Sequence, residues 1–276
     1  MEYQKKKDLI IIKKTDDFDV VQTLECGQIF RFLIKDKTAQ VFCLDKMAKI
    51  NFEDDIVIET KDVDFFENFF DLKTDYSEIK KQLGTDEFLA PAVKYGHGIR
   101  IIKNDCYEML ISFIISANNN IKRIKNSIDY LCKHFGSDMG DYFAFPTLKQ
   151  LKTATLNDFV KAGLGYRAPQ MLETVDMLTD EKINDLLKMN EQEQFNFLLS
   201  LKGIGEKVAN CVMLFGLGNK NVFPVDTWIN KVYNNLTHTT ETNRKKITKE
   251  LTSRYKDLSG YAQQYFFFYY RDNKLN

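Results

Sequence analysis

The chain has 276 residues, of which 39 are basic and 39 acidic, so its formal net charge is zero. With 44% hydrophobic and 13% aromatic residues, the composition excludes disordered, collagen-like and low-complexity proteins and suits one large or two modest domains. The apolar runs are too short for a membrane span or a secretory signal. The five cysteines stand singly, which predicts a cytoplasmic protein with reduced thiols and no metal cluster.

Charge is distributed unevenly along the chain. Residues 53–89 carry twelve acidic and four basic side chains, residues 93–134 carry seven basic and three acidic, and residues 244–256 carry six basic and one acidic. Local potential attracts a polyanion whatever the net charge of the protein. The two basic segments therefore allow a nucleic-acid surface, although ordinary solvated helix faces show the same pattern.

The order of predicted elements indicates an α+β fold. Apolar or alternating runs separated by polar clusters predict strands at residues 9–12, 30–34, 40–44 and 56–59, and a short helix is expected at 65–70. After Asp105, a predicted helix N-cap, the apolar spacing becomes helical. We therefore predict an N-terminal antiparallel β-sheet domain at residues 1–100, followed by a mostly α-helical region at residues 101–276.

A glycine turn joins two of the predicted helices. Gly203 and Gly205 can adopt backbone angles closed to other residues, and they leave amide groups exposed at the start of the second helix, where the dipole favours an anion. They are candidate DNA phosphate ligands in a helical hairpin at about residues 192–215. The same two glycines could also serve only to turn the chain.

Lys207 and Asp226 are the candidate catalytic pair. An amine attacks a carbon only in its neutral form, which burial and nearby positive potential favour, and Lys207 lies in the first turn of the second hairpin helix. Asp226 follows 19 residues later behind a proline and could stabilise positive charge on a substrate. The alternatives are a surface lysine and an aspartate that caps a helix.

Four blocks of the chain resemble a known family. They are residues 201–226, with G-I-G-x-K and P-V-D, and residues 27–31, 116–124 and 163–168. Together they are similar to the helix-hairpin-helix, Gly-Pro-Asp superfamily of base-excision repair enzymes, and most closely to its 8-oxoguanine DNA glycosylase/AP lyase branch. The resemblance extends over roughly residues 8–272.

The resemblance implies a function and a role for each site residue. Lys207 attacks C1′ of the damaged nucleotide, expels 8-oxoguanine opposite cytosine and forms a Schiff base. Asp226 stabilises the charged transition state. A β-elimination then nicks the strand. The base must first leave the stack. The implied damaged-base pocket consists of Gly27, Cys211, Gln263 and Phe267, the last with a register uncertain by one residue. The residues implied to fill the hole and grip the estranged cytosine are Asn118, Arg123, Tyr166 and Arg167.

Cofactor, partner and location follow from the same resemblance. Trp228 stands where eukaryotic relatives carry a phosphate-contacting histidine, and Lys202 stands where proline is usual. Since no cysteine follows Cys211, an iron–sulfur cluster is not expected, and no cofactor is required. A structural cation on the hairpin backbone is compatible with the family. The expected partner is double-stranded DNA containing oxidised guanine, bound by a monomer in the cytoplasm, or at the nucleoid in a prokaryote.

Two other functions remain open. A monofunctional glycosylase for alkylated purines also uses an aspartate but needs no lysine nucleophile. A non-catalytic DNA-binding module would use the hairpin, with Lys207 serving only as a phosphate contact.

Overall fold

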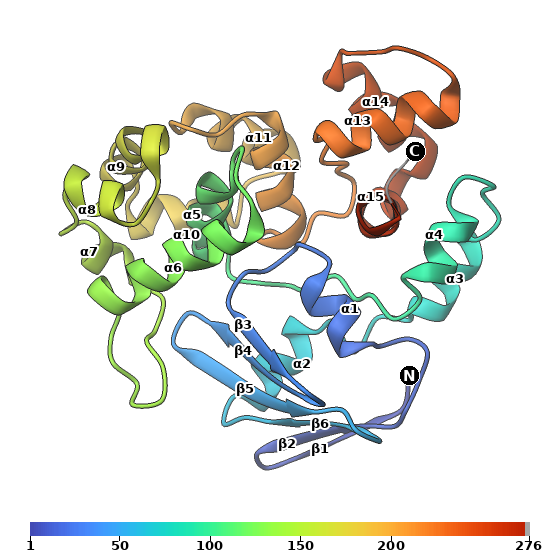
Figure 1. The fold of residues 1–276 in the computed structure, drawn as a ribbon, viewed down its shortest axis with the longest axis horizontal. Helices are drawn as coiled ribbons and strands as arrows, with labels where there is room; N and C mark the ends of the chain where they lie inside the picture. Colours follow the sequence, from blue (N-terminus) through green and yellow to red (C-terminus); the bar gives the residue numbers. More distant parts are fainter. Residues whose placement is uncertain (274–276) are drawn as a thin grey trace.

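A six-stranded antiparallel sheet forms the lower part of the molecule in Figure 1, a computed structural model that describes residues 1–273. The strands follow the order β1-β2-β6-β5-β4-β3, and β6 joins the two halves of the sheet by pairing with both β2 and β5. They span Tyr3–Lys6 (β1), Leu9–Ile12 (β2), Phe32–Lys35 (β3), Thr38–Cys43 (β4), Lys46–Asn51 (β5) and Ile56–Glu59 (β6). The predicted antiparallel sheet is confirmed.

Two strands, β1 and β5, lie outside the predicted runs. β1 reads Tyr-Gln-Lys-Lys and is mostly exposed at the sheet edge, so it carries no hydrophobic alternation. In β5 only Ala48 and Ile50 are buried, and Lys49 and Asn51 beside Ile50 are exposed. Both strands form because neighbouring strands supply backbone hydrogen bonds to them. The residues of the segment itself do not predict that pairing.

Four helices lie in the first hundred residues, where the sequence predicts one. They span Val20–Glu25 (α1), Val63–Phe69 (α2), Tyr76–Leu83 (α3) and Ala90–Tyr95 (α4). The aromatic side chains of α2 belong to the hydrophobic core under the sheet, as expected for the predicted helix at 65–70. Helices α3 and α4 instead contribute to the core of the helical region, and α4 packs against the last helix of the chain.

The remainder of the described chain is helical, as predicted. Asp105 caps the first of these helices, with its Oδ1 accepting a hydrogen bond from the Glu108 amide at 3.0 Å. The helices span Cys106–Ser116 (α5), Ile121–Phe135 (α6), Leu148–Leu151 (α7), Leu156–Lys161 (α8), Ala168–Met177 (α9), Asp180–Leu186 (α10), Glu191–Ser200 (α11), Glu206–Phe215 (α12), Thr227–Thr237 (α13), Arg244–Tyr255 (α14) and Ser259–Asp272 (α15), with 3-10 turns at Gly165–Arg167 (η1) and Lys256–Leu258 (η2).

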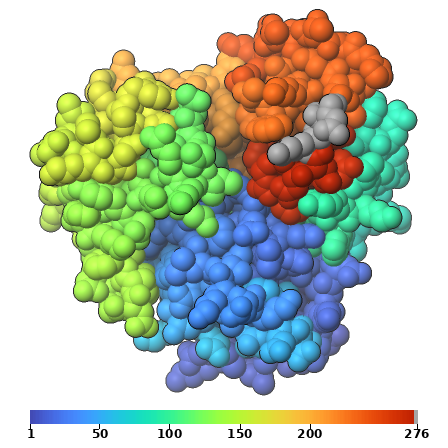
Figure 2. Space-filling model, viewed as in Figure 1, coloured from blue at the N-terminus to red at the C-terminus, as the bar shows by residue number. Residues whose placement is uncertain are grey.

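The helices form two groups above the sheet. Helices α5 to α10 lie together on one side of Figure 1, and α13, α14 and α15 lie on the other, with α3 and α4 beside them. In Figure 2 the surface is hollowed between the green and the orange-red groups, with the blue N-terminal region at the base. Within residues 1–273, no helix is long and apolar enough to cross a membrane.

Lys220, in the segment between α12 and α13, has a buried amine. Its Nζ has no hydrogen-bond partner within residues 1–273 and lies 5.3 Å from the centroid of the Tyr261 ring. Burial lowers the pKa of Lys220 to about 8; the Asp71 carboxylate opposes this effect, and Lys103 adds to it. The charged ammonium form of Lys220 therefore lowers the free energy of unfolding, because the ammonium has lost its water without gaining a hydrogen bond.

Replacing Lys220 with methionine is expected to raise the free energy of unfolding at neutral pH. A pKa lowered from 10.5 to about 8 corresponds to a cost of about 3 kcal/mol below pH 8. Between these two values the unfolded chain holds a proton that the folded protein has lost, so wild-type stability rises with pH in that window. Urea unfolding at pH 7 and pH 10 measures both effects.

The matched control is Lys7→Met, which removes an exposed lysine from a turn. Its stability is expected to stay within about 0.5 kcal/mol of wild type, as is usual at the surface. A Lys220→Met protein less stable than wild type at pH 7 would contradict the assignment of an unfavourable buried charge.

Candidate active site

The turn between α11 and α12 has the geometry of an anion site. Gly203 adopts φ +78°, and a Cβ added there would lie 3.0 Å from the Gln170 side-chain oxygen. Thr174 anchors the turn by donating a hydrogen bond to the Lys202 carbonyl at 2.8 Å. Gly205 is the N-cap of α12 and offers no side-chain cap, so the first amides of this helix are left for an external acceptor.

Lys207 and Asp226 flank one buried thiol. Lys207 is half-buried in the first turn of α12, and Cys211 lies one turn further along the same helix. Burial raises the pKa of the Cys211 thiol; the nearby Lys207 amine lowers it and the Asp226 carboxylate raises it. Both groups are therefore near enough to Cys211 to affect its thiol.

Asp226 is also a helix cap, which was the structural alternative for this residue. Its Oδ1 accepts a hydrogen bond from the Ile229 amide at 2.9 Å, at the start of α13. Its other carboxylate oxygen has no hydrogen-bond partner within residues 1–273. The cap fixes the orientation of the carboxylate and leaves the second oxygen available to an external partner.

Phe113 belongs to the site, although its helical spacing suggests only a core residue. The Lys207 Nζ lies 5.4 Å from the centroid of its ring. The ring also packs edge-on against Phe30 at 5.7 Å, in the segment that follows Gly27. Phe113 therefore links the amine to the predicted damaged-base pocket, and the sequence holds no signal for this contact because helix α5 is buried almost all round.

Gly27 and Phe267 are in direct contact across the pocket. Gly27 adopts φ +86°, and a Cβ there would lie 2.9 Å from Cε1 of Phe267. Phe267 is half-buried, whereas Phe266 and Phe268 are buried in the core. Among these three aromatic residues, Phe267 is the one that faces the Gly27 backbone.

Glutamines hold the walls of this pocket. The Gln28 amide donates to the Thr23 and Arg100 carbonyls at 2.8 and 2.7 Å, and its oxygen accepts from the Ile102 amide at 2.8 Å. Gln264 donates to the Cys26 carbonyl at 2.6 Å. These bonds tie the loop that contains Gly27 to both the connection before α5 and helix α15.

Gln263 differs from its neighbour Gln264. It is 6% exposed, and its Oε1 has no hydrogen-bond partner among the described residues. A buried polar atom is normally paired, so an unpaired acceptor marks a position where a ligand or water donates. The prediction that Gln263 meets the edge of a base stays a prediction, with this acceptor in its favour.

The predicted duplex wedge is built from two loops. Asn118 is exposed after α5 with φ +48°, and Tyr166, which is 61% exposed in η1, donates from its hydroxyl to the neighbouring Ala117 carbonyl at 3.4 Å. Arg167 connects the loops by donating to the Ala117 carbonyl at 2.6 Å and the Asn118 carbonyl at 3.2 Å. The structure thus brings these predicted residues together on one exposed rim.

The two predicted cytosine-gripping arginines differ in burial. Arg167 is 4% exposed, and its guanidinium also donates to the Leu164 carbonyl at 2.6 Å. Arg123 is exposed in the first turn of α6, and within residues 1–273 its guanidinium makes no hydrogen bond or ion pair. Arg123 therefore has its whole guanidinium available to an external acceptor, whereas Arg167 commits three of its five N–H groups to backbone carbonyls.

Comparison with known proteins identifies the family. Residues 10–110 match the 8-oxoguanine DNA glycosylase N-terminal domain, and residues 111–257 match the HhH-GPD superfamily of base excision DNA repair proteins. The chain belongs to the HhH-GPD superfamily. The boundary between the two matched regions falls inside α5. The same helix contributes Phe113 to the candidate site of this HhH-GPD protein.

The similarity of this HhH-GPD protein to individual relatives is extensive. The N-glycosylase/DNA lyase OGG1 of Arabidopsis thaliana is 30% identical over 74% of this chain, and the match spans 60% of that protein. A probable N-glycosylase/DNA lyase of Methanothermobacter thermautotrophicus is 30% identical, covering 76% of this chain and 75% of its own length. The Clostridium acetobutylicum 8-oxoguanine glycosylase/lyase, in complex with dsDNA containing cytosine opposite 8-oxoG, is 34% identical with a TM-score of 0.91, covering 100% of this chain and 99% of that one.

Proposed function

We propose that this protein is a bifunctional DNA glycosylase/AP lyase that excises 8-oxoguanine opposite cytosine and nicks the strand in base excision repair. The observation that carries the proposal is the half-buried Lys207 amine, which sits at the uncapped start of α12, with its Nζ 5.4 Å from the centroid of the Phe113 ring. The names of the relatives, N-glycosylase/DNA lyase and 8-oxoguanine glycosylase/lyase, support the same activity.

Lys207 supplies the nucleophile in both reactions. Its neutral Nζ attacks C1′ of the flipped nucleotide, the glycosidic bond breaks, and the base leaves with the bonding electrons and a proton. Nζ then loses one proton, the C1′–O4′ bond breaks as O4′ takes up a proton, and Nζ and C1′ form a protonated imine. Asp226, through its unpaired oxygen, stabilises the positive charge that develops on the sugar.

Strand cleavage follows from the imine. The protonated imine withdraws electrons from C2′, so a C2′ proton is lost and the bond from C3′ to its phosphate oxygen breaks. Water then hydrolyses the imine and releases Lys207. Both steps use one covalent intermediate, which borohydride reduces to a stable amine.

The pocket residues account for the choice of base. The carbonyl of Gly27 is proposed to accept the N7–H of 8-oxoguanine, which guanine lacks, while Cys211 and Phe267 sandwich the ring and Gln263 meets its Watson–Crick edge. With guanine, the Gly27 carbonyl would lose its donor, and that loss disfavours the undamaged base. The half-buried Phe267 ring against Gly27 supports this arrangement.

Trapping distinguishes the proposed function from both alternatives. The protein is incubated with borohydride and duplexes that carry one 8-oxoguanine opposite each of the four bases. A covalent adduct that is strongest opposite cytosine supports the proposal. Base release from alkylated DNA without an adduct would assign the protein to the monofunctional branch, and binding without either reaction would leave a DNA-binding module.

Replacing Arg123 with alanine is expected to relax the preference for cytosine. A guanidinium that donates to two base acceptors contributes discrimination of about 1–3 kcal/mol, so the cytosine preference should fall about tenfold or more. Single-turnover excision opposite each of the four bases measures this. Lys122→Ala removes an adjacent exposed charge from α6 and is the control, with its ranking of opposite bases unchanged. An unchanged ranking in Arg123→Ala would refute the role.

The remaining expectations belong to this proposal. The proposed reaction uses only protein groups, so we propose that it requires no cofactor and no iron–sulfur cluster. A structural cation on the hairpin backbone stays a prediction. We further propose that the protein binds duplex DNA as a monomer in the cytoplasm, or at the nucleoid if its source is a prokaryote.

A further inference from the structure

The first turn of α14 contacts both helices that carry the catalytic pair. The Lys245 ammonium lies 2.7 Å from a carboxylate oxygen of Glu206, the first residue of α12. The neighbouring Arg244 guanidinium donates to the Thr227 hydroxyl at 3.2 Å, in the first residue of α13. Segments 17 to 39 residues apart thus meet where α12 and α13 begin.

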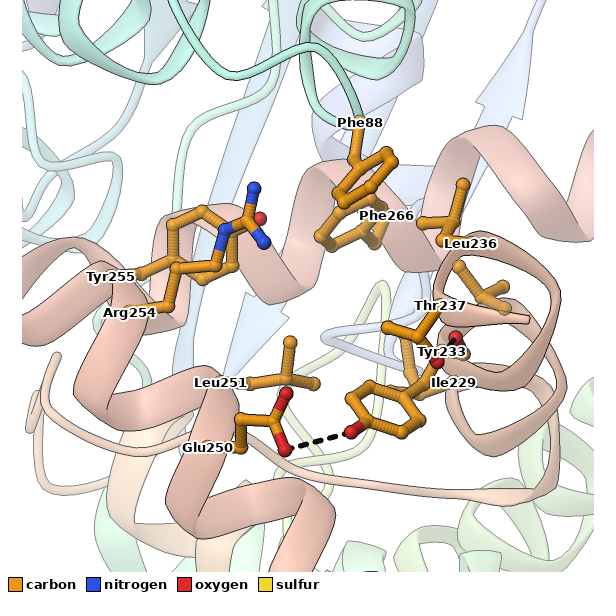
Figure 3. A pocket seen from close by; sticks show the side chains of 11 residues that line it. Phe88, Ile229, Tyr233, Leu236, Thr237, Glu250, Leu251, Arg254, Tyr255 and Phe266 are labelled. Carbon is orange, nitrogen blue, oxygen red and sulfur yellow. Dashed lines mark hydrogen bonds between the residues drawn. The ribbon is translucent and has the colours of Figure 1, made fainter. Parts of the chain in front are cut away.

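Helix α14 is held firmly in this position. The Tyr233 hydroxyl of α13 donates to Glu250 of α14 at 2.7 Å, across the small apolar cavity drawn in Figure 3. Further along α14, Arg254 pairs with Asp86 at 2.7 Å. The cavity is about 30 Å³, too small for more than a water molecule, so α13, α14 and α15 pack as one unit.

Glu206 presents an electrostatic problem for DNA binding. Its carboxylate stands in the first turn of α12, the same turn whose uncapped amides are the proposed phosphate site. A carboxylate is favoured by the helix dipole, but it repels a second anion that approaches the same amides. Lys245 offsets this charge: its side chain is 77% exposed and the Glu206 side chain 34% exposed, so the pair lies at the surface where DNA would approach.

We propose that Lys245 is a positioning residue for the DNA backbone. Its ammonium neutralises the Glu206 carboxylate, so that the start of α12 can accept a phosphate. The proposal rests on the proposed DNA glycosylase function and concerns the affinity of the hairpin for DNA. Lys245 acts through Glu206 and touches neither the base nor the sugar. The hydrogen bond with Glu206 also raises the pKa of Lys245, which keeps the ammonium charged at all physiological pH values.

A double-mutant cycle with Glu206 tests the proposal. Binding is measured on a duplex with a tetrahydrofuran abasic analogue, which no lyase can cleave. Lys245→Gln is expected to bind about fivefold more weakly at low ionic strength, the effect of one exposed charge near a helix end, with a smaller difference at high salt. Glu206→Gln in the same chain is expected to restore affinity to within about twofold of wild type, because no carboxylate then needs neutralising. Lys245→Arg should bind like wild type.

Lys246 provides the matched control on the same helix. It pairs with Glu241 at 2.8 Å and not with α12, so Lys246→Gln removes an equal charge without exposing Glu206. It is expected to weaken binding less than Lys245→Gln does. The proposal is overturned if Lys245→Gln binds like wild type, or if it loses as much affinity in the Glu206→Gln background, since Lys245 would then contact phosphate directly. Trapping of the wild-type protein tests the glycosylase function separately.

Discussion

Replacing Lys207 with glutamine is expected to abolish base release, strand cleavage and borohydride trapping, while binding to an 8-oxoguanine duplex is retained. Glutamine fits the half-buried position beside the Phe113 ring and leaves the amides of α12 in place, but its amide nitrogen does not attack a sugar carbon. Because both reactions pass through one amine, both rates should fall together by about 10³-fold or more. Single-turnover assays on 8-oxoguanine and on preformed abasic sites measure the two losses.

Lys202→Gln is the control for charge in the same hairpin. Lys202 is exposed and its backbone carbonyl is held by Thr174, so the substitution removes a positive charge near the proposed phosphate site without altering the turn. It is expected to weaken binding modestly, and trapping should persist. Base release near the wild-type rate in Lys207→Gln would show that another group breaks the glycosidic bond.

The second large effect is expected from Gly27→Ala, in the damaged-base pocket. A Cβ at this position meets the Phe267 ring at 2.9 Å, and φ is +86°, where a residue with a side chain is strained by about 1–3 kcal/mol. The ring must therefore leave the position from which it is proposed to stack on the base. We expect excision of 8-oxoguanine to fall about 10- to 100-fold, a range typical of a small steric change in a specificity pocket.

Two comparisons separate the pocket effect from a general loss of structure. Cleavage of a preformed abasic site needs no base in the pocket, so Gly27→Ala should retain that lyase activity. Gly140→Ala introduces a similar strain at φ +88° in a position where the added Cβ meets nothing within 4 Å, and it should retain both activities. Equal loss of excision and lyase activity in Gly27→Ala would contradict a role in accommodating the base.

The candidate site combines groups from distant parts of the chain. Lys207 and Asp226 come from the starts of two consecutive helices, whereas Phe113 and Phe267 come from α5 and α15. Gly27 comes from the loop before β3, which Gln264 of α15 and other buried amides hold in place. The base pocket therefore depends on how the sheet domain packs on the helices, while the nucleophile depends mainly on the hairpin.

Secondary structure with a local signal was predicted correctly. The N-cap at Asp105 and the glycine turn before α12 depend on side chains or backbone angles within a few residues. Strands β1 and β5 and helices α1, α3 and α4 were not predicted, because much of their stability comes from partners elsewhere. In β5, for example, only Ala48 and Ile50 are buried, and pairing with β4 supplies the hydrogen bonds.

The sequence by itself determined the α+β class, the hairpin and the candidate pair Lys207 and Asp226, because each of these is encoded in spacing along the chain. Only the tertiary structure decided which side chains face the site. It turned Phe267, rather than Phe266 or Phe268, toward the Gly27 loop, and it set Lys245 against Glu206. The physical reason is that burial and charge pairing are properties of surfaces that meet, and residues far apart in sequence form those surfaces.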